Sequence, residues 1–285
     1  MGKSFRFSLG DISCVTLFDG SRTMPLRATF PAVPESTFEE VILAEEYPAE
    51  VTVGYNILYL TIAGKHCLID SGLGSGELLV SLKTLGLKPE DIDTLIITHN
   101  DGDHIGGLKD FPNAEIVMAR KAWELWTNEA ARQGMIQEFI KLFEGKLSTE
   151  DLEARAASRE NHGAKILPSL KDRVRLVEPE EEILKGIHLI YAPGHRTDHY
   201  AVDITSGEES LIHVADSVRH PVQATYSWAS FIDSSPKRLV KTNEKLFKRI
   251  LQKNALIFGM HFPFPALARV SEQNNKRTWQ WIDPT

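Results

Sequence analysis

The sequence lacks the features that would assign it to a membrane or secreted class. Its longest apolar runs, such as HLIYAP and NALIFGM, are far shorter than the ~20 residues that cross a bilayer. The opening MGKSFRFSLG has no apolar core of a signal peptide, and Arg6 stands where a myristoylation signal needs Ser or Thr. These absences predict a cytoplasmic protein with no membrane partner.

Cysteine and clustered basic residues are also scarce. The 285 residues include 2 cysteines and no C-x-x-C pair, which predicts two reduced core thiols rather than a disulfide framework. The formal net charge is −7 and no basic block occurs, so we expect no nucleic-acid partner. The remaining composition, 42% hydrophobic and 25% charged, is that of an ordinary soluble globular protein.

Strand-like and helix-like segments alternate in both halves of the chain. Apolar runs such as residues 93–99 (DTLIITH) and 255–261 (ALIFGMH) predict buried strands. Residues 236–252 predict a helix that has a proline in its first turn. Because no linker rich in proline, glycine or serine divides the chain, we expect one α/β domain over residues 1–285, with two sheets and outer helices.

Residues 121–165 differ from their surroundings because they are helical by composition. Their apolar side chains could form one face: Trp123, Trp126, Ile136, Phe139, Ile140 and Phe143. Such a face predicts packing against a core, and a helical insertion there could also wall a pocket.

The stretch ITHNDGDHIGG, residues 97–107, concentrates side chains that bind metals. It contains four of them: His99, Asp101, Asp103 and His104. Other strand-like runs also end in His or Asp, at Asp70, His195, Asp216 and His261. Strand ends and the loops after them are where an α/β scaffold places site residues, so this repetition predicts convergence on metal ions.

In this order and spacing the segments resemble the metallo-β-lactamase superfamily. Residues 99–104 correspond to its H-x-H-x-D-H signature, with Asp101 in the place of the second histidine. The segments FPNAEIVMARKAWELW and HFPFPALARV look like the subgroup of methyl parathion hydrolase and the quorum-quenching lactonases. The resemblance implies a four-layer αβ/βα sandwich with a helical insertion at about 121–165 and a metal site at one edge.

The resemblance also implies a role for each of these residues. Site one would be held by His99, Asp101 and His195, and site two by Asp103, His104 and His261. Asp216 would bridge two divalent ions, which the resemblance implies are zinc. Asp70 would lie behind the ligands and orient them.

Asp101 changes the chemistry expected of such a site. A carboxylate in place of a neutral imidazole takes the ligand charge from −2 to −3, which should make a bound water ionise less readily. An oxygen donor also favours harder ions, so manganese or iron gains on zinc. We expect Asp101→His to keep or raise zinc affinity. The alternative is that site one is lost and the protein holds one ion or none.

Three further residues border this set in the sequence. His199 is expected to stabilise a loop or the ligands from behind, whereas His220 could line the pocket or belong to the core. Arg219 stands where lactonase relatives often have tyrosine, and its charge suits an anionic substrate group, although a surface salt bridge would also explain it.

The function expected from this resemblance is a metal-dependent hydrolase. A metal-bridging hydroxide, positioned by the catalytic residue Asp103, would cleave a lactone, a carboxylic ester or a phosphoester. The alternatives are a di-iron redox protein, because flavodiiron proteins also carry a carboxylate at that signature position, and a non-catalytic metal-binding protein. A small-molecule substrate is the expected partner, and a homodimer is left open.

Overall fold

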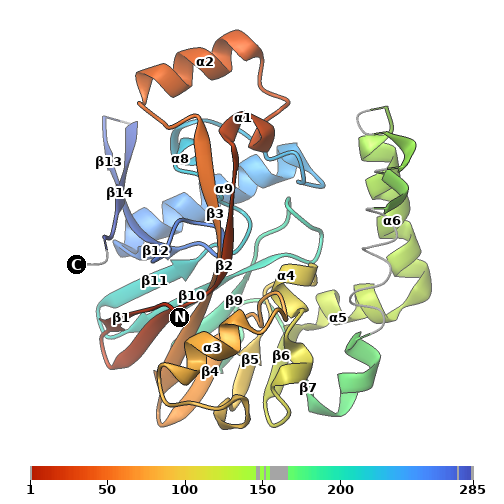
Figure 1. Cartoon of the computed structure of the whole chain (residues 1–285), viewed down its shortest axis with the longest axis vertical. Helices are drawn as coiled ribbons and strands as arrows, with labels where there is room; N and C mark the ends of the chain where they lie inside the picture. The colour runs from red at the N-terminus through yellow and green to blue at the C-terminus, as the bar shows by residue number, and fades with distance from the viewer. Residues whose placement is uncertain (1, 146–147, 151, 155–165, 275, 284–285) are drawn as a thin grey trace.

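Two seven-stranded sheets face each other in the computed structural model, which describes residues 2–145, 148–150, 152–154, 166–274 and 276–283 (Figure 1). In order across the first sheet, the strands are β1 (Ser4–Leu9), β2 (Ile12–Pro25), β3 (Glu50–Ile62), β4 (Lys65–Ile69), β5 (Thr94–Ile96), β6 (Glu115–Ala119) and β7 (Val174–Val177). In order across the second, they are β14 (Lys276–Trp281), β13 (Leu267–Gln273), β12 (Leu256–Phe258), β11 (Glu209–His213), β10 (Tyr200–Ser206), β9 (Ile187–Tyr191) and β8 (Glu182–Leu184).

The main core lies between the two sheets. Leu58 and Leu60 of β3 point into it and share one apolar cluster with Leu189 and Val202 of the second sheet. Alternate residues of a strand point to opposite faces, and Tyr59 accordingly belongs to a separate cluster on the outer face of the first sheet.

Helices cover both outer faces, which completes the four layers. Leu78 and Leu82 of α3 (Glu77–Lys83) pack in the outer cluster of the first sheet, together with α4 (Gly102–Ile105) and α5 (Arg120–Thr127). Leu246 and Phe247 of α9 (Pro236–Lys253) pack against the second sheet. The predicted αβ/βα sandwich and the helix expected at 236–252 are therefore confirmed.

One helix escaped the sequence analysis. Helix α2 (Glu35–Ala44) follows the short α1 (Leu26–Thr29) and stands at the top of the molecule in Figure 1. Phe38 and Val41 are one helical turn apart and are buried in a small cluster with Phe30. That spacing was visible in the sequence and could have predicted the helix.

The helical insertion is confirmed within the described residues. Helices α5 and α6 (Glu129–Phe143) account for its first half, and α6 stands beside the sandwich in Figure 1. Trp126, Ile136 and Phe139 are buried, as expected of a packing face, whereas Trp123 and Ile140 are partly exposed. The expected helical stretch at 155–165, like residues 146–147 and 151, lies outside the described residues.

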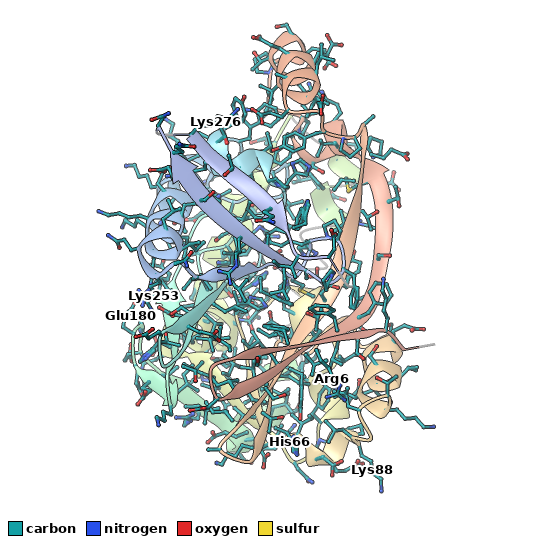
Figure 2. The ribbon with its side chains drawn as sticks, turned by 90° about the vertical axis from the view of Figure 1, so that its left-hand side faces the viewer. Arg6, His66, Lys88, Glu180, Lys253 and Lys276 are labelled. Atoms are coloured by element: carbon teal, nitrogen blue, oxygen red, sulfur yellow. The ribbon has the colours of Figure 1, made fainter. Side chains whose placement is uncertain are left out.

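The short elements that remain are α8 (Val222–Thr225) and the 3-10 turns η1 (Pro89–Asp91), η2 (Leu108–Asp110) and η3 (Leu167–Arg173). Among the described residues, every helix is too short or too polar to cross a membrane. Charged side chains such as Lys88, Lys253 and Lys276 lie at the periphery of the molecule (Figure 2).

Candidate metal centre

The expected metal-binding side chains meet at one edge of the sandwich because they follow strands that run the same way. Strand β4 pairs in parallel with β5, and β11 pairs in parallel with β12. Asp70 comes directly after β4 and Asp216 comes three residues after β11, so both project from carboxyl ends. The segments after β5, β9 and β12, which include the short helix α4, supply the expected ligands His99, Asp103, His104, His195 and His261.

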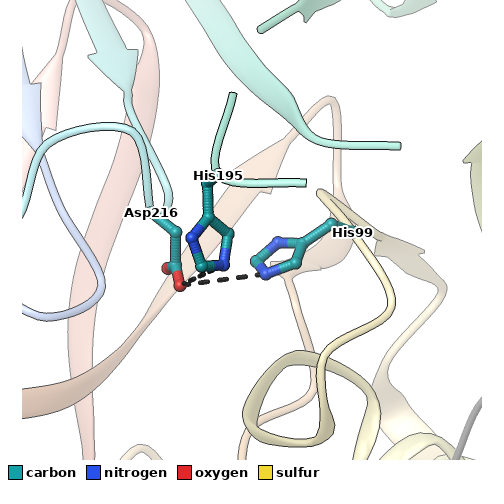
Figure 3. Close-up of side chains that lie close together, drawn as sticks. All are labelled: His99, His195 and Asp216. Atoms are coloured by element: carbon teal, nitrogen blue, oxygen red, sulfur yellow. Dashed lines mark ion pairs between the residues drawn. The ribbon is translucent and has the colours of Figure 1, made fainter. Parts of the chain in front are cut away.

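Two groups of three side chains are each close enough to share one ion. His99, His195 and Asp216 form the first group (Figure 3), and Asp103, His104 and His261 form the second. In the first, Oδ2 of Asp216 lies 3.3 Å from Nε2 of His195 and 3.8 Å from Nε2 of His99. In the second group, Oδ2 of Asp103 lies 3.4 Å from Nε2 of His261.

Asp216 belongs to the first group and also faces the second. Its Oδ1 faces the second group, 3.1 Å from Nε2 of His104 and 3.2 Å from Nε2 of His261, while its Oδ2 faces the first. One carboxylate with an oxygen toward each group has the geometry of a bridging ligand. The structure thus places all seven expected ligands in one cluster, with Asp101 at its rim.

The ring nitrogens on the far side of the histidines are held by other groups. Asp70 accepts a bond of 2.7 Å from Nδ1 of His104 and two bonds of 2.8 Å from Thr98. Asp233 lies 2.9 Å from Nδ1 of His195. Such partners fix the ring orientation and leave Nε2 facing the cluster, as metal-binding histidines require.

Both groups have the unsatisfied atoms that a metal site needs. Among the described residues, Nε2 of His99, His104 and His261 and Oδ1 of Asp216 are buried without a hydrogen-bond partner. Buried polar atoms are otherwise almost always satisfied, so four such atoms directed at one place fit divalent cations as the missing partners. Imidazole and carboxylate donors suit zinc and other first-row ions.

The electrostatics of the cluster also favour a cation. Burial holds the pKa of His99 well below its usual range, and the neighbouring His104 lowers it further, so His99 keeps its lone pair. Burial would also lower the pKa of His104, but Asp216 and Asp70 outweigh it and hold that pKa well above normal. Burial would raise the pKa of Asp216, but Arg219 and the surrounding histidines hold it well below normal.

Asp101, at the rim of the cluster, is paired with Arg196, which donates hydrogen bonds to both of its oxygens. Nε of Arg196 donates to Oδ1 at 3.0 Å and Nη2 donates to Oδ2 at 2.6 Å, while Oδ2 also lies 3.3 Å from Nε2 of His195. The arginine side chain is only 4% exposed. The expected ligand charge of −3 therefore omitted a buried cation that offsets the charge of Asp101.

The residues that border the cluster have distinct positions. Nε2 of His199 accepts a 3.0 Å bond from the backbone N–H of Asp216, and its Nδ1 donates to Ala192, so it holds the bridging residue from behind. Arg219 is not on the surface: it is 11% exposed and Nη2 donates to Asp216. His220 is buried and lines a narrow cavity beside His261.

Sequence reasoning missed two residues that shape the site. Arg196 directly follows His195, and a cation adjacent to the site could have been matched with the unusual carboxylate at Asp101. Asp233 lies in a loop between β11 and α9 and carries no local signal, because only the fold brings it to His195.

Comparison with known proteins agrees with this geometry. Residues 51–261 match the family model of the metallo-beta-lactamase superfamily. The chain belongs to that superfamily. It is 25% identical over 191 residues to an N-acyl homoserine lactonase of Bacillus cereus, covering 65% of this chain and 62% of that protein. It is also 26% identical over 162 residues to a probable metallo-hydrolase of Mycobacterium tuberculosis, covering 55% of this chain and 46% of that protein.

The chain thus spans only about half the length of some curated relatives that it matches. Among solved structures, AidC, a dizinc quorum-quenching lactonase, matches with a TM-score of 0.83 and 22% identity, covering 99% of both chains. The hydrolase AbOPH matches with the same TM-score and 24% identity, covering 99% of this chain and 98% of the other. At this identity the two structures support the fold alone.

Proposed function

We propose that this chain is a dinuclear metal-dependent hydrolase of lactones, carboxylic esters or phosphoesters. The observation that carries the proposal is the position of Asp216, with one oxygen toward each three-residue group. His99, His195 and Asp216 would hold one ion, with Asp101 beside it, and Asp103, His104, His261 and Asp216 would hold the other. Two bound ions would polarise the substrate and lower the pKa of a water.

The residues of the chain have separable tasks in this reaction. The side chain of Asp103 is 24% exposed. Its carboxylate can therefore contact a water or a substrate in addition to its contact with His261. It would accept a hydrogen bond from the attacking water and orient its lone pair toward the acyl or phosphoryl centre. The deeply buried histidines, held by Asp70 and Asp233, would keep both ions fixed while the charge on the substrate changes.

The relatives support the proposed class of bond that is hydrolysed. A lactonase of Bacillus cereus and the lactonase AidC share the family or the fold with this chain. Because Arg196 offsets the charge of Asp101, water ionisation should be closer to that of a site with a neutral ligand, which leaves zinc as the expected ion. Manganese and iron remain alternatives because Asp101 offers oxygen rather than nitrogen.

The test is turnover measured together with metal content. Protein purified without added metal would be assayed on an acyl homoserine lactone, a 4-nitrophenyl ester and a phosphotriester, before and after chelation and after reloading with zinc or manganese. We expect turnover of at least one class, lost on chelation and restored by metal. Asp216→Asn should lose it, whereas Asp172→Asn on the surface is the matched control. Bound iron with oxygen consumption and no hydrolysis would favour the redox alternative.

A further inference from the structure

Site two is assembled from both sheets. Asp103 and His104 follow β5 of the first sheet, whereas His261 follows β12 of the second. The distance between these side chains therefore depends on how firmly the segment around His261 is held to the first sheet. Strand β3 of the first sheet makes that connection, because its residues 54–56 are hydrogen-bonded to residues 260–262.

The main chains of these two segments are bonded directly. The N–H of Gly54 donates to the carbonyl of His261 at 3.2 Å, and the N–H of Asn56 donates to the carbonyl of Met260 at 3.0 Å. The approach is so close that only glycine fits at position 54, because a Cβ there would overlap the carbonyl oxygen of Phe262. His261 is thus held against β3 by its own main chain.

The imidazole of His261 is oriented by the same strand. Its Nδ1 donates to the carbonyl of Gly54 at 3.0 Å, which leaves Nε2 facing Asp103 and Asp216. The ring of Tyr55 packs against the imidazole, with the ring centroids 5.5 Å apart and the planes nearly perpendicular, at 84°. Contacts from two consecutive residues of β3 therefore set the orientation of the ring.

Asn56 completes the connection through its side chain. It is fully buried, and its Nδ2 donates to the carbonyls of Met260, at 2.9 Å, and Phe262, at 2.8 Å. These two residues flank His261 in the sequence. An amide nitrogen suits this place because it carries two N–H donors, whereas a hydroxyl has one and a carboxylate has none. The peptide groups on both sides of the expected ligand are thus fixed by one side chain.

We propose that Asn56 is a positioning residue for site two, which holds His261 in place through the carbonyls of Met260 and Phe262. The inference rests on the proposed two-ion hydrolase and adds to it a residue that acts only through another. Partners that orient metal ligands typically contribute about 10–100-fold in metal affinity. We expect the loss of Asn56 to weaken zinc binding at site two by a factor in this range.

Chelator competition on the zinc-loaded protein measures the effect without requiring turnover. Asn56→Leu keeps the approximate size of the side chain and removes both donors, so zinc at site two should bind about 10–100-fold more weakly while site one keeps its affinity. Asn56→Ser, which retains one donor, should lose less. Thr16→Val is the matched control, because the buried Thr16 hydroxyl donates to Pro265 of the same loop, at 2.8 Å, rather than to the carbonyls beside His261. It should leave both zinc affinities unchanged.

A double-mutant cycle separates positioning from a general loss of stability. His261→Ala identifies the zinc affinity that belongs to site two. If Asn56 acts through His261, the zinc affinities of His261→Ala should be the same with and without Asn56→Leu. In the background of Asp233→Asn, which perturbs the site of His195, Asn56→Leu should still have its full effect.

The outcomes separate this inference from the function on which it rests. An unchanged affinity at site two in Asn56→Leu, or an equal loss at both sites, would overturn the role of Asn56. A further loss of zinc affinity when Asn56→Leu is added to His261→Ala would overturn it as well. If Asn56→Leu does not fold, Asn56→Ser gives the same comparisons. Absence of hydrolysis by the zinc-loaded protein would overturn the proposed function while the affinities still decide the role of Asn56.

Discussion

The buried pair of Asp101 and Arg196 should be strongly coupled, and a double-mutant cycle measures that coupling. Both oxygens of Asp101 accept from the guanidinium, and the two side chains are 19% and 4% exposed. Breaking a buried pair by removing one partner typically costs ~3–5 kcal/mol, whereas exposed pairs contribute ~0–1 kcal/mol. Since Asp101 is partly exposed, we expect a coupling energy of about 2–3 kcal/mol.

The two single changes should not be equally costly. Arg196→Gln removes the pair and also the bonds from Nη1 to the carbonyls of His195, at 2.8 Å, and Ile232, at 2.5 Å. Asp101→Asn keeps the shape of the side chain, and the buried Arg196 loses its hydrogen-bonded carboxylate but keeps the electrostatic attraction of Asp233 and Asp216. Arg196→Gln should therefore destabilise the metal-free protein more, and the double variant should cost less than the sum of the two.

The same pair alters the expected outcome of restoring the family histidine. Asp101→His leaves Arg196 buried without its partner, so we now expect this variant to lose stability and to bind zinc at site one more weakly. Combining it with Arg196→Gln removes the uncompensated cation and should recover part of the affinity. This replaces the expectation from sequence that Asp101→His alone keeps or raises zinc affinity.

Urea unfolding of the metal-free variants gives the free energies of unfolding for the double-mutant cycle. Metal analysis after dialysis gives the occupancy of the two sites. Arg175→Gln, which breaks a largely exposed pair with Glu115, is a matched control and should cost under about 1 kcal/mol. A coupling energy below about 1 kcal/mol for Asp101 and Arg196 would refute the reasoning. Full zinc occupancy in Asp101→His at wild-type stability would refute it as well.

Three smaller predictions concern groups around the cluster. Asp70→Asn should lower metal affinity at the site of His104, and Asp233→Asn at the site of His195, each by about 10–100-fold in chelator competition. Loss of the same ion in both variants would contradict the assignment of the two sites. Burial lowers the pKa of His220 to about 4, so its contribution to stability is complete above about pH 6.5 and is lost as pH falls toward 4. His220 should therefore contribute a fall of up to about 2 kcal/mol in the free energy of unfolding between pH 7 and pH 5, in addition to the buried His199 and His213, and His220→Gln should reduce that slope. An unchanged slope would indicate that His220 is not the group responsible.

The layers of the fold could be predicted because local patterns determine them. Continuous apolar runs predicted strands such as β5 and β12, and residues 236–252, with a proline in the first turn, predicted α9. Helix α2 was overlooked, although Phe38 and Val41 are spaced one turn apart. The position of the metal cluster followed from its residues because His and Asp at strand ends meet wherever parallel strands end at one edge.

The surroundings of the cluster were less predictable, because they depend on contacts between distant segments. Asp233 reaches His195 across 38 residues, and no local pattern marks it. Arg196 is adjacent to His195 in sequence, but its bidentate contact with Asp101 spans 95 residues. For this reason the charge estimate for the site counted only the expected ligands and omitted Arg196, the cation that the fold places beside Asp101.

The most direct test of a two-ion centre bridged by Asp216 is the metal content of the purified chain, measured by mass spectrometry alongside hydrolytic turnover. We predict two divalent ions per chain, falling to one or none in Asp216→Asn together with the loss of turnover. A single ion per chain after saturation with zinc and manganese, or full turnover in Asp216→Asn, would contradict the two-ion centre.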